Sequence, residues 1–196
     1  TGICGAAETM LVHQDVAAEM LPAIAADLQK AGCQLRGDSA AKSLVPDMQL
    51  ANDDDWHTEY LDAILSVRVV DSIDTAIDHI ARYGSGHTES IITESDEAAD
   101  AFLTRVDSAI VMRNASTQFA DGGEFGMGAE IGIATGRLHA RGPVGGAQLT
   151  SCSLSHQVCA KRALCAHSKH WPYGLSKRED DFLARQSGIG RQEGRG

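Results

Sequence analysis

Short apolar runs alternate with amphipathic segments along the first 150 residues of the chain. The runs at 10–12, 64–70, 90–93 and 109–112 are rich in aliphatic residues and too short for helices, which is typical of buried strands. Strands that alternate with helices favour parallel pairing, because each crossover helix returns the chain to the same end of the sheet. We therefore expect an α/β fold with a largely parallel sheet flanked by helices.

The amphipathic segments indicate where the helices lie. Apolar residues recur at helical spacing over 22–31, so we expect a helix that begins at Pro22, where a missing amide hydrogen costs least. Gly32 follows and can close this helix with a left-handed backbone angle. Asp74 precedes a second apolar stripe and is expected to cap that helix.

Glycine dominates one later region. Eight glycines occur between Gly122 and Gly145, and each costs about 0.5–1 kcal/mol inside a regular helix or strand. We therefore expect this region to be a loop with unusual backbone angles. Within it, Gly126-Met127-Gly128 is a weak dinucleotide-binding signal, because the spacing of the full fingerprint is absent.

Composition and charge argue against several classes of partner. The net charge of −10 argues against binding to a phosphate backbone, so we expect no nucleic-acid partner. No stretch approaches the roughly 20 apolar residues that cross a bilayer, so we expect no membrane partner and a cytoplasmic location. Five irregularly spaced cysteines suit free thiols better than a disulfide framework.

Four stretches, taken in order along the chain, resemble γ-glutamyl phosphate reductases, a branch of the aldehyde dehydrogenase superfamily. They are Thr1-Gly2-Ile3-Cys4-Gly5-Ala6-Ala7-Glu8-Thr9 with its continuation to His13, residues 55–67, residues 83–92, and residues 114–122 with their continuation to 145. The resemblance implies an aldehyde-dehydrogenase-like catalytic domain over 1–145. It also implies that the dinucleotide-binding domain lies upstream of Cys4 and is missing from this sequence, so the chain is expected to be a fragment.

The balance of basic and acidic residues changes after about residue 151. Residues 152–196 carry eight Lys and Arg against four Asp and Glu, whereas residues 1–151 carry nine against 23. No part of the resemblance extends into this segment. We therefore expect a divergent, poorly ordered tail over 146–196.

The resemblance implies NADPH-dependent reduction of L-glutamyl 5-phosphate to L-glutamate 5-semialdehyde and phosphate, the second step of proline biosynthesis. Cys4 would be the nucleophile that forms a thioester, which requires the thiolate and hence a lowered pKa. Taken without its motif, Cys4 would more simply be a small buried apolar residue. Glu59 is implied to contact the ribose hydroxyls of the cofactor, and the plainer reading is an exposed carboxylate at the entrance to a strand.

The remaining expected site residues would contact the substrate. They are Asn114, Ser116, Thr117, Asp121 and Arg141. Asn, Asp and Ser also form ordinary turns, and Arg141 also suits a surface ion pair. Many family members have Arg where this chain has Gln118 and Asn where it has Gly5, which weakens any phosphate contact from position 118.

Two other functions stay open. One is an aldehyde dehydrogenase of different substrate specificity, and the other is a non-catalytic fragment that binds zinc or a partner through the Cys and His residues of its tail. The spacing of those residues matches no paired ligand signature, so no metal site is expected. The resemblance further implies a homo-oligomer in the full-length enzyme and glutamate 5-kinase as a partner.

Overall fold

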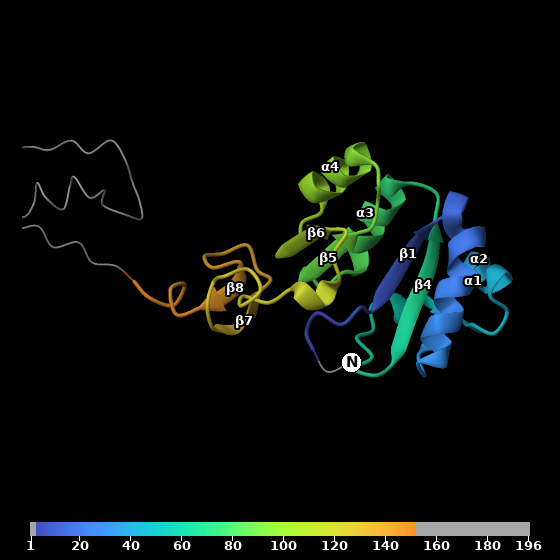
Figure 1. The fold of residues 1–196 in the computed structure, drawn as a ribbon, viewed down its shortest axis with the longest axis horizontal. Helices are drawn as coiled ribbons and strands as arrows, with labels where there is room; N and C mark the ends of the chain where they lie inside the picture. Colours follow the sequence, from blue (N-terminus) through green and yellow to red (C-terminus); the bar gives the residue numbers. More distant parts are fainter. Residues whose placement is uncertain (1–2, 152–196) are drawn as a thin grey trace, which may run out of the picture. The chain divides into compact units, whose positions relative to one another are not determined.

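A computed structural model describes residues 3–151 of the chain (Figure 1). Its main element is a four-stranded, wholly parallel sheet in the order β1-β4-β2-β3. The strands are β1 (Thr9–His13), β2 (Gln34–Gly37), β3 (Gln49–Leu50) and β4 (Ile64–Val70). The predicted α/β fold with a largely parallel sheet is confirmed.

Helices α1 (Gln14–Lys30) and α2 (Ser39–Leu44) cover one face of this sheet (Figure 1). The predicted start of the first helix at Pro22 is wrong, because the helix begins eight residues earlier. The side chain of His13 accepts a hydrogen bond from the Asp15 amide and caps the first turn. Pro22 is exposed in mid-helix, where its lost hydrogen bond is offset by burial of Leu21 and Ala25 on the sheet. Gly32 follows with φ +86°, as predicted.

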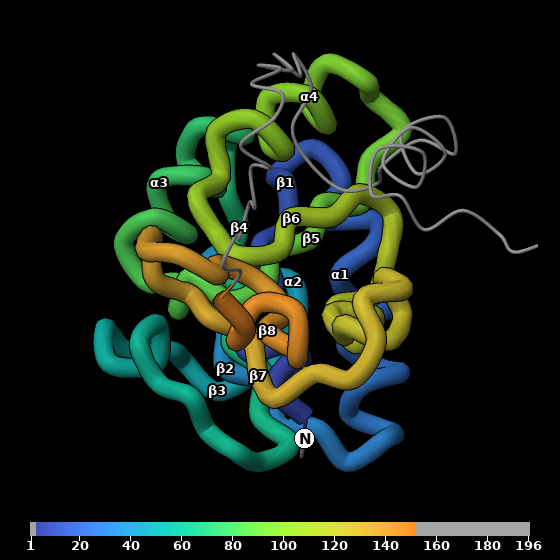
Figure 2. Tube along the Cα trace, turned by 90° about the vertical axis from the view of Figure 1, so that its left-hand side faces the viewer, coloured from blue at the N-terminus to red at the C-terminus, as the bar shows by residue number. Residues whose placement is uncertain are grey.

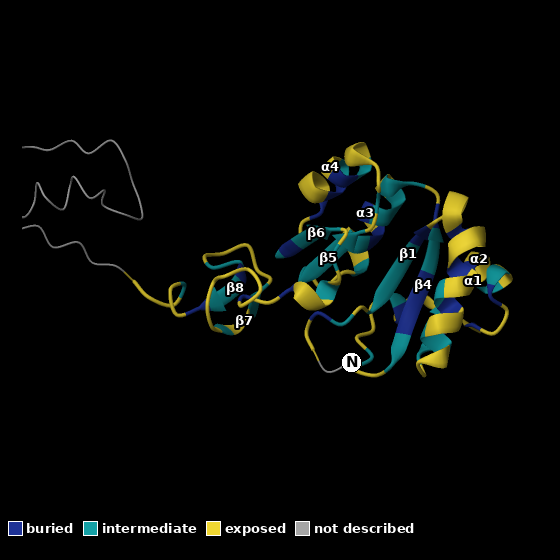
Figure 3. Cartoon of the chain, viewed as in Figure 1, coloured by how far each residue is buried: buried dark blue, intermediate teal, exposed yellow. Residues whose placement is uncertain are grey.

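The main core lies between α1, α2 and the sheet. Leu21, Leu35 and Val67 are almost fully buried there, and Figure 3 shows the buried length of β4 facing the helices. Side chains alternate along a strand, so Ser66 and Arg68 of β4 point to the opposite face. On that opposite face, Ser66 lies within hydrogen-bond distance of Tyr60, and Arg68 bonds to His79 of the following helix.

A second layer follows β4 along the chain (Figure 2). It consists of α3 (Ile73–Tyr83), β5 (Thr88–Ile91), α4 (Asp96–Arg105) and β6 (Ile110–Arg113), with β5 and β6 paired in parallel. Ile77, Phe102 and Val106 form its small core. The N-cap of α3 is Ser72, whose side chain accepts from the Thr75 amide, so the predicted cap at Asp74 is wrong. Asp74 lies in the first turn instead, where its charge favours the helix dipole.

The glycine-rich region is only partly a loop. It contains an antiparallel pair of strands, β7 (Glu130–Ala134) and β8 (Gly142–Gly145), which the prediction of a continuous loop missed. Gly126, Gly128 and Gly142 do have positive φ angles, as expected of that region. The strands form because cross-strand hydrogen bonds offset the low strand propensity of glycine.

Two short 3₁₀ helices complete the described residues, η1 (Asp53–Trp56) and η2 (Thr117–Phe119). No helix among residues 3–151 is long and apolar enough to span a membrane. The predicted tail over 146–196 lies, beyond Ser151, outside the described residues, and so do its Cys and His residues. The expected boundary at residue 145 stays a prediction.

Candidate active site

The expected nucleophile lies in a tight turn just before β1. The Ala6 amide donates to the Ile3 carbonyl across this turn at 3.1 Å, which leaves the Cys4 thiol exposed. The next residue, Gly5, is buried. A side chain there would meet the Thr117 carbonyl, with an added Cβ under 3.0 Å from the oxygen and 3.2 Å from the carbon. The backbone that carries Cys4 therefore packs directly against η2.

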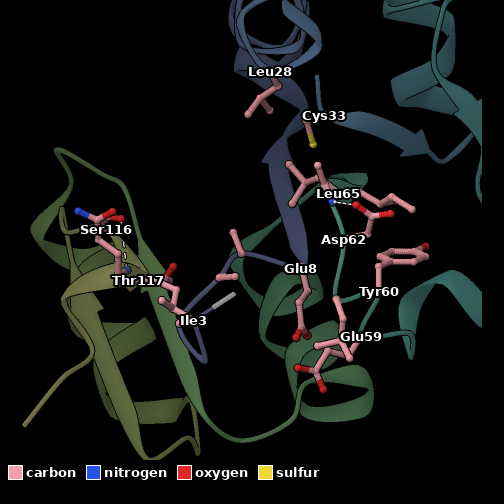
Figure 4. Close-up of a pocket in the computed structure, with 17 residues that line it drawn as sticks. Ile3, Glu8, Leu28, Cys33, Glu59, Tyr60, Asp62, Leu65, Ser116 and Thr117 are labelled. Carbon is pink, nitrogen blue, oxygen red and sulfur yellow. Dashed lines mark hydrogen bonds between the residues drawn. The ribbon is translucent and has the colours of Figure 1, made fainter. Parts of the chain in front are cut away.

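A cavity of about 380 Å³ opens beside this turn (Figure 4). It is lined by Ile3 and Gly5, which flank Cys4, and by Glu59, Ser116 and Thr117. Its walls thus come from three of the four motifs that carry the resemblance. Leu28 and Leu65 belong to a more apolar part of the lining, which lies toward α1 and β4.

Two carboxylates face each other in this cavity. Figure 4 shows Glu8 and Glu59 with their side chains close together, and Glu59 is exposed. Burial and, after it, the charge of Glu59 raise the pKa of Glu8 above its usual value. The nearby charge of Glu59 therefore makes ionisation of Glu8 less favourable.

A third acid, Glu89, lies near enough to Glu8 for their charges to interact, but it does not line the cavity. Burial raises the pKa of Glu89 to about 7, with a weaker upward contribution from Glu8 and an opposing hydrogen bond from Ser108. The Ser108 hydroxyl donates to a Glu89 carboxylate oxygen at 3.4 Å. Sequence reasoning missed Glu8 as a cavity residue, although it lies inside a matched motif.

Ser116 and Thr117 are held by η2. The Ser116 hydroxyl caps this short helix by accepting from the Gln118 amide at 3.3 Å. Ser90 in β5 donates to the Ala115 carbonyl at 2.7 Å and fixes the start of the same segment. Ser116 therefore combines the turn-forming role with a place in the cavity wall, and Gln118 lines the cavity beside it.

The other expected substrate contacts do not line the cavity. Asn114 bonds through its side chain to both backbone groups of Thr93, at 2.8 Å and 3.1 Å, and its φ is +52°. Asp121 accepts from the Gly123 amide at 2.7 Å in a local turn. Arg141 donates to the Asp107 carboxylate at 2.5 Å and to its carbonyl at 3.0 Å. In this structure all three bond to residues that do not line the cavity.

Cys33 is the other thiol among the described residues, and it lines the apolar part of the cavity. Its side chain packs against the main core and donates weakly to the Gln34 carbonyl at 3.6 Å. Burial raises the pKa of the Cys33 thiol, so less of it is thiolate at neutral pH. Cys33 is thus the less suitable nucleophile of the two.

The residues that the structure describes contain no group of three or more His, Cys, Asp or Glu side chains placed to hold a metal ion. The expected ligands of a zinc-binding tail lie outside those residues. The cavity itself offers carboxylates, hydroxyls and backbone groups. These are donor and acceptor types that suit an organic substrate or the hydroxyls of a ribose.

Comparison with known proteins gives a consistent answer. The chain is 61% identical over 151 residues to γ-glutamyl phosphate reductase from Hyphomonas neptunium, which covers 77% of this chain and 35% of the relative. It is 64% identical over 149 residues to the same enzyme from Caulobacter vibrioides, covering 76% and 36%. Over this length the chain is a homologue of γ-glutamyl phosphate reductase. No family model matches it.

Solved structures agree with this homology. The γ-glutamyl phosphate reductase of Thermotoga maritima has 52% identity and a TM-score of 0.75, covering 76% of this chain and 36% of that one. A propionaldehyde dehydrogenase from Clostridium phytofermentans has 16% identity and a TM-score of 0.52, covering 81% and 45%. The second likeness shows the aldehyde-dehydrogenase-like fold alone. The chain spans about a third of the length of the reductases it matches.

Proposed function

We propose that residues 1–151 provide the thiol-bearing part of a γ-glutamyl phosphate reductase, with Cys4 as its nucleophile. One observation carries the proposal: the residues on both sides of Cys4 line the same cavity as Glu59, Ser116 and Thr117. These residues come from separate matched motifs. Their convergence on one cavity, in a chain 61% identical to such enzymes, supports a shared site.

In the proposed reaction the Cys4 thiolate attacks the acyl carbon of L-glutamyl 5-phosphate. A carbon–sulfur bond forms, the bond to the phosphate oxygen breaks, and inorganic phosphate leaves with that electron pair. The exposed position of Cys4 gives the substrate access to the sulfur. Ser116 and Thr117 line the cavity with their polar groups, and the Thr117 backbone lies directly against the turn that carries Cys4 (Figure 4).

A nicotinamide cofactor fits the donor set, and we assign NADPH to this role. When bound, it would supply the hydride for reduction to L-glutamate 5-semialdehyde, in which the carbon–sulfur bond breaks and Cys4 leaves as the thiolate. Glu59 is exposed at the cavity and has no hydrogen-bond partner within residues 3–151, so its carboxylate is free to accept from ribose hydroxyls. Asn114, Asp121 and Arg141 are also assigned to the substrate, which requires the segments that hold them to move in the complete enzyme.

Three further assignments rest on the resemblance of the motifs. They are a homo-oligomeric assembly, glutamate 5-kinase as a functional partner that supplies the acyl phosphate, and a cytoplasmic location. An acyl phosphate hydrolyses readily, so direct transfer from a kinase to the reductase would protect it. The second step of proline biosynthesis is the reaction that these assignments describe.

The proposal is tested in a composite enzyme. The matching segment of the Caulobacter vibrioides reductase, 64% identical over 149 residues, is replaced by the corresponding residues of this chain. We expect the composite to oxidise NADPH with L-glutamyl 5-phosphate and to release phosphate. Cys4→Ser should lower kcat/KM at least about 1,000-fold, because the nucleophile is lost.

The matched control is Cys33→Ser, which alters a thiol in the apolar part of the same cavity. This variant should keep most of the activity, since its thiol packs against the core. A composite that is folded but inactive would contradict the proposal. So would a Cys4→Ser variant that still reduces the acyl phosphate at the unmodified rate.

A further inference from the structure

Glu59 lies at the tip of a chain reversal between η1 and β4. The reversal starts with Asn52, whose backbone amide and side chain bond within a capping box around Asp55. Asp55 is only 4% exposed, and Leu61 has a φ of +54°, an uncommon angle for a leucine. Leu61, two residues after Glu59, holds an unfavourable backbone angle, so contacts elsewhere in the reversal must stabilise its conformation.

The carboxylate of Asp55 provides one set of these contacts. It accepts from the Arg36 guanidinium at 2.6 Å, from the Tyr60 hydroxyl at 2.5 Å and from the Asn52 amide at 2.7 Å. Burial works to raise the pKa of Asp55, but these three hydrogen bonds outweigh it and lower the pKa. Asp55 is therefore ionised at neutral pH and has three donors around it.

Tyr60 is the residue that closes the reversal. Besides bonding to Asp55, its hydroxyl lies 3.3 Å from the Ser66 hydroxyl in β4, and the Arg36 guanidinium lies 4.9 Å from its ring centroid. Its ring lines the cavity next to Glu59 (Figure 4). Tyr60 is thus held from β2, η1 and β4 at once, one residue after Glu59.

The other side of the reversal is held by Trp56. Its ring meets the ring of His79 edge to face, with centroids 5.4 Å apart, and Arg68 lies 5.9 Å from its centroid. His79 is buried, and its Nδ1 accepts from Arg68 at 2.8 Å. Burial and the Arg68 charge lower the pKa of His79 to about 4, so this anchor stays neutral at physiological pH.

We propose that Tyr60, through its hydrogen bond to Asp55, is a positioning residue that aims Glu59 at the cofactor ribose. The inference rests on the proposed function, which assigns Glu59 to that contact. Both ends of this segment are fixed, Trp56 by α3 and β4 and Tyr60 by Asp55, so only His57, Thr58 and Glu59 lie between the two fixed residues. Loss of the Tyr60 hydroxyl releases one end of that segment while leaving the ring in place.

The test measures steady-state kinetics of the composite enzyme with NADPH as the varied substrate. The variants compared are Glu59→Gln, Tyr60→Phe and the double variant. A ribose contact is made equally in the ground and transition states, so its loss should change KM for NADPH rather than kcat. We expect Glu59→Gln and Tyr60→Phe each to raise KM for NADPH about five- to tenfold with kcat little changed. The double variant should be no worse than Glu59→Gln alone, since Tyr60 acts through Glu59.

The matched control is Tyr83→Phe, which removes a hydroxyl that makes no hydrogen bond within residues 3–151; its KM should be unchanged. A rise in KM for Glu59→Gln without one for Tyr60→Phe overturns the positioning role and leaves the ribose contact intact. Additive effects in the double variant also overturn it. If Glu59→Gln leaves KM unchanged while Cys4→Ser remains inactive, the positioning role fails and the proposed reaction stands.

Discussion

Gly5→Ala should move the nucleophile, because the backbone of Gly5 lies directly against the Thr117 carbonyl. The added Cβ would start under 3.0 Å from the oxygen, and ordinary contact begins at 3.4 Å, so the two backbones must separate. No flexible side chain is available to yield, since the obstructing atoms belong to the backbone of η2. Overpacking of this kind costs about 1–3 kcal/mol of stability.

Gly5→Ala should also lower kcat. Cys4 precedes Gly5 in the same turn, so a shift of the turn carries the sulfur with it. A misplacement of about 1 Å in a reacting group can lower the rate about 100-fold. We therefore expect Gly5→Ala in the composite enzyme to reduce kcat by about 10- to 100-fold, with a smaller change in KM for NADPH.

Two assays check this expectation. Steady-state kinetics give the change in kcat, and thermal unfolding of the full 196-residue chain gives the change in stability. Gly146→Ala is the matched control, because nothing lies within 4 Å of a Cβ added at Gly146 and its φ is not in the left-handed region. A Gly5→Ala variant with unchanged kcat and unchanged stability would refute the claim that this backbone contact sets the position of Cys4.

Two further predictions concern stability, both measured by unfolding of the full chain. The folded chain binds more protons than the unfolded chain between the usual Glu pKa of 4.5 and the folded value of about 7, because burial raises the pKa of Glu89. Stability should fall as pH rises through this window, and Glu89→Gln should flatten the fall; an equal slope in the variant would contradict this cause. Asn114→Ala should cost about 2 kcal/mol and Asn114→Gly about 1 kcal/mol, because only alanine adds strain at a φ of +52°. Equal losses would show that the left-handed angle costs nothing here.

Two strands of the main sheet, β1 and β4, could be predicted because their signals are local, whereas the short strands β2 and β3 were missed. The run at 64–70 is continuous and aliphatic, and the structure has β4 over those residues. The start of α1 could not be predicted from Pro22, since proline usually marks a first turn and only burial of the helix on the sheet keeps it in mid-helix. The β7–β8 pair was missed for a similar reason, because cross-strand pairing offsets the composition of the segment.

Some residues of the candidate site could be predicted from the sequence, and others depend on the tertiary fold. Cys4 and Glu59 were available from the matched motifs, and the structure places Glu59 and both neighbours of Cys4 at one cavity. Glu89 could not be found from its sequence position, because its unusual acidity arises from burial, which depends on the tertiary fold. The hydrogen bonds of Asn114 to Thr93 were equally hidden, since those residues are 21 positions apart.

The order of the strands has a consequence for synthesis on the ribosome. β4 is the last strand of the main sheet along the chain, yet it lies between β1 and β2 and pairs with both. β1 and the β2–β3 pair therefore cannot be joined into one sheet until residue 70 has left the exit tunnel. A nascent chain stalled before that point should bind chaperones, and one stalled well after it should not.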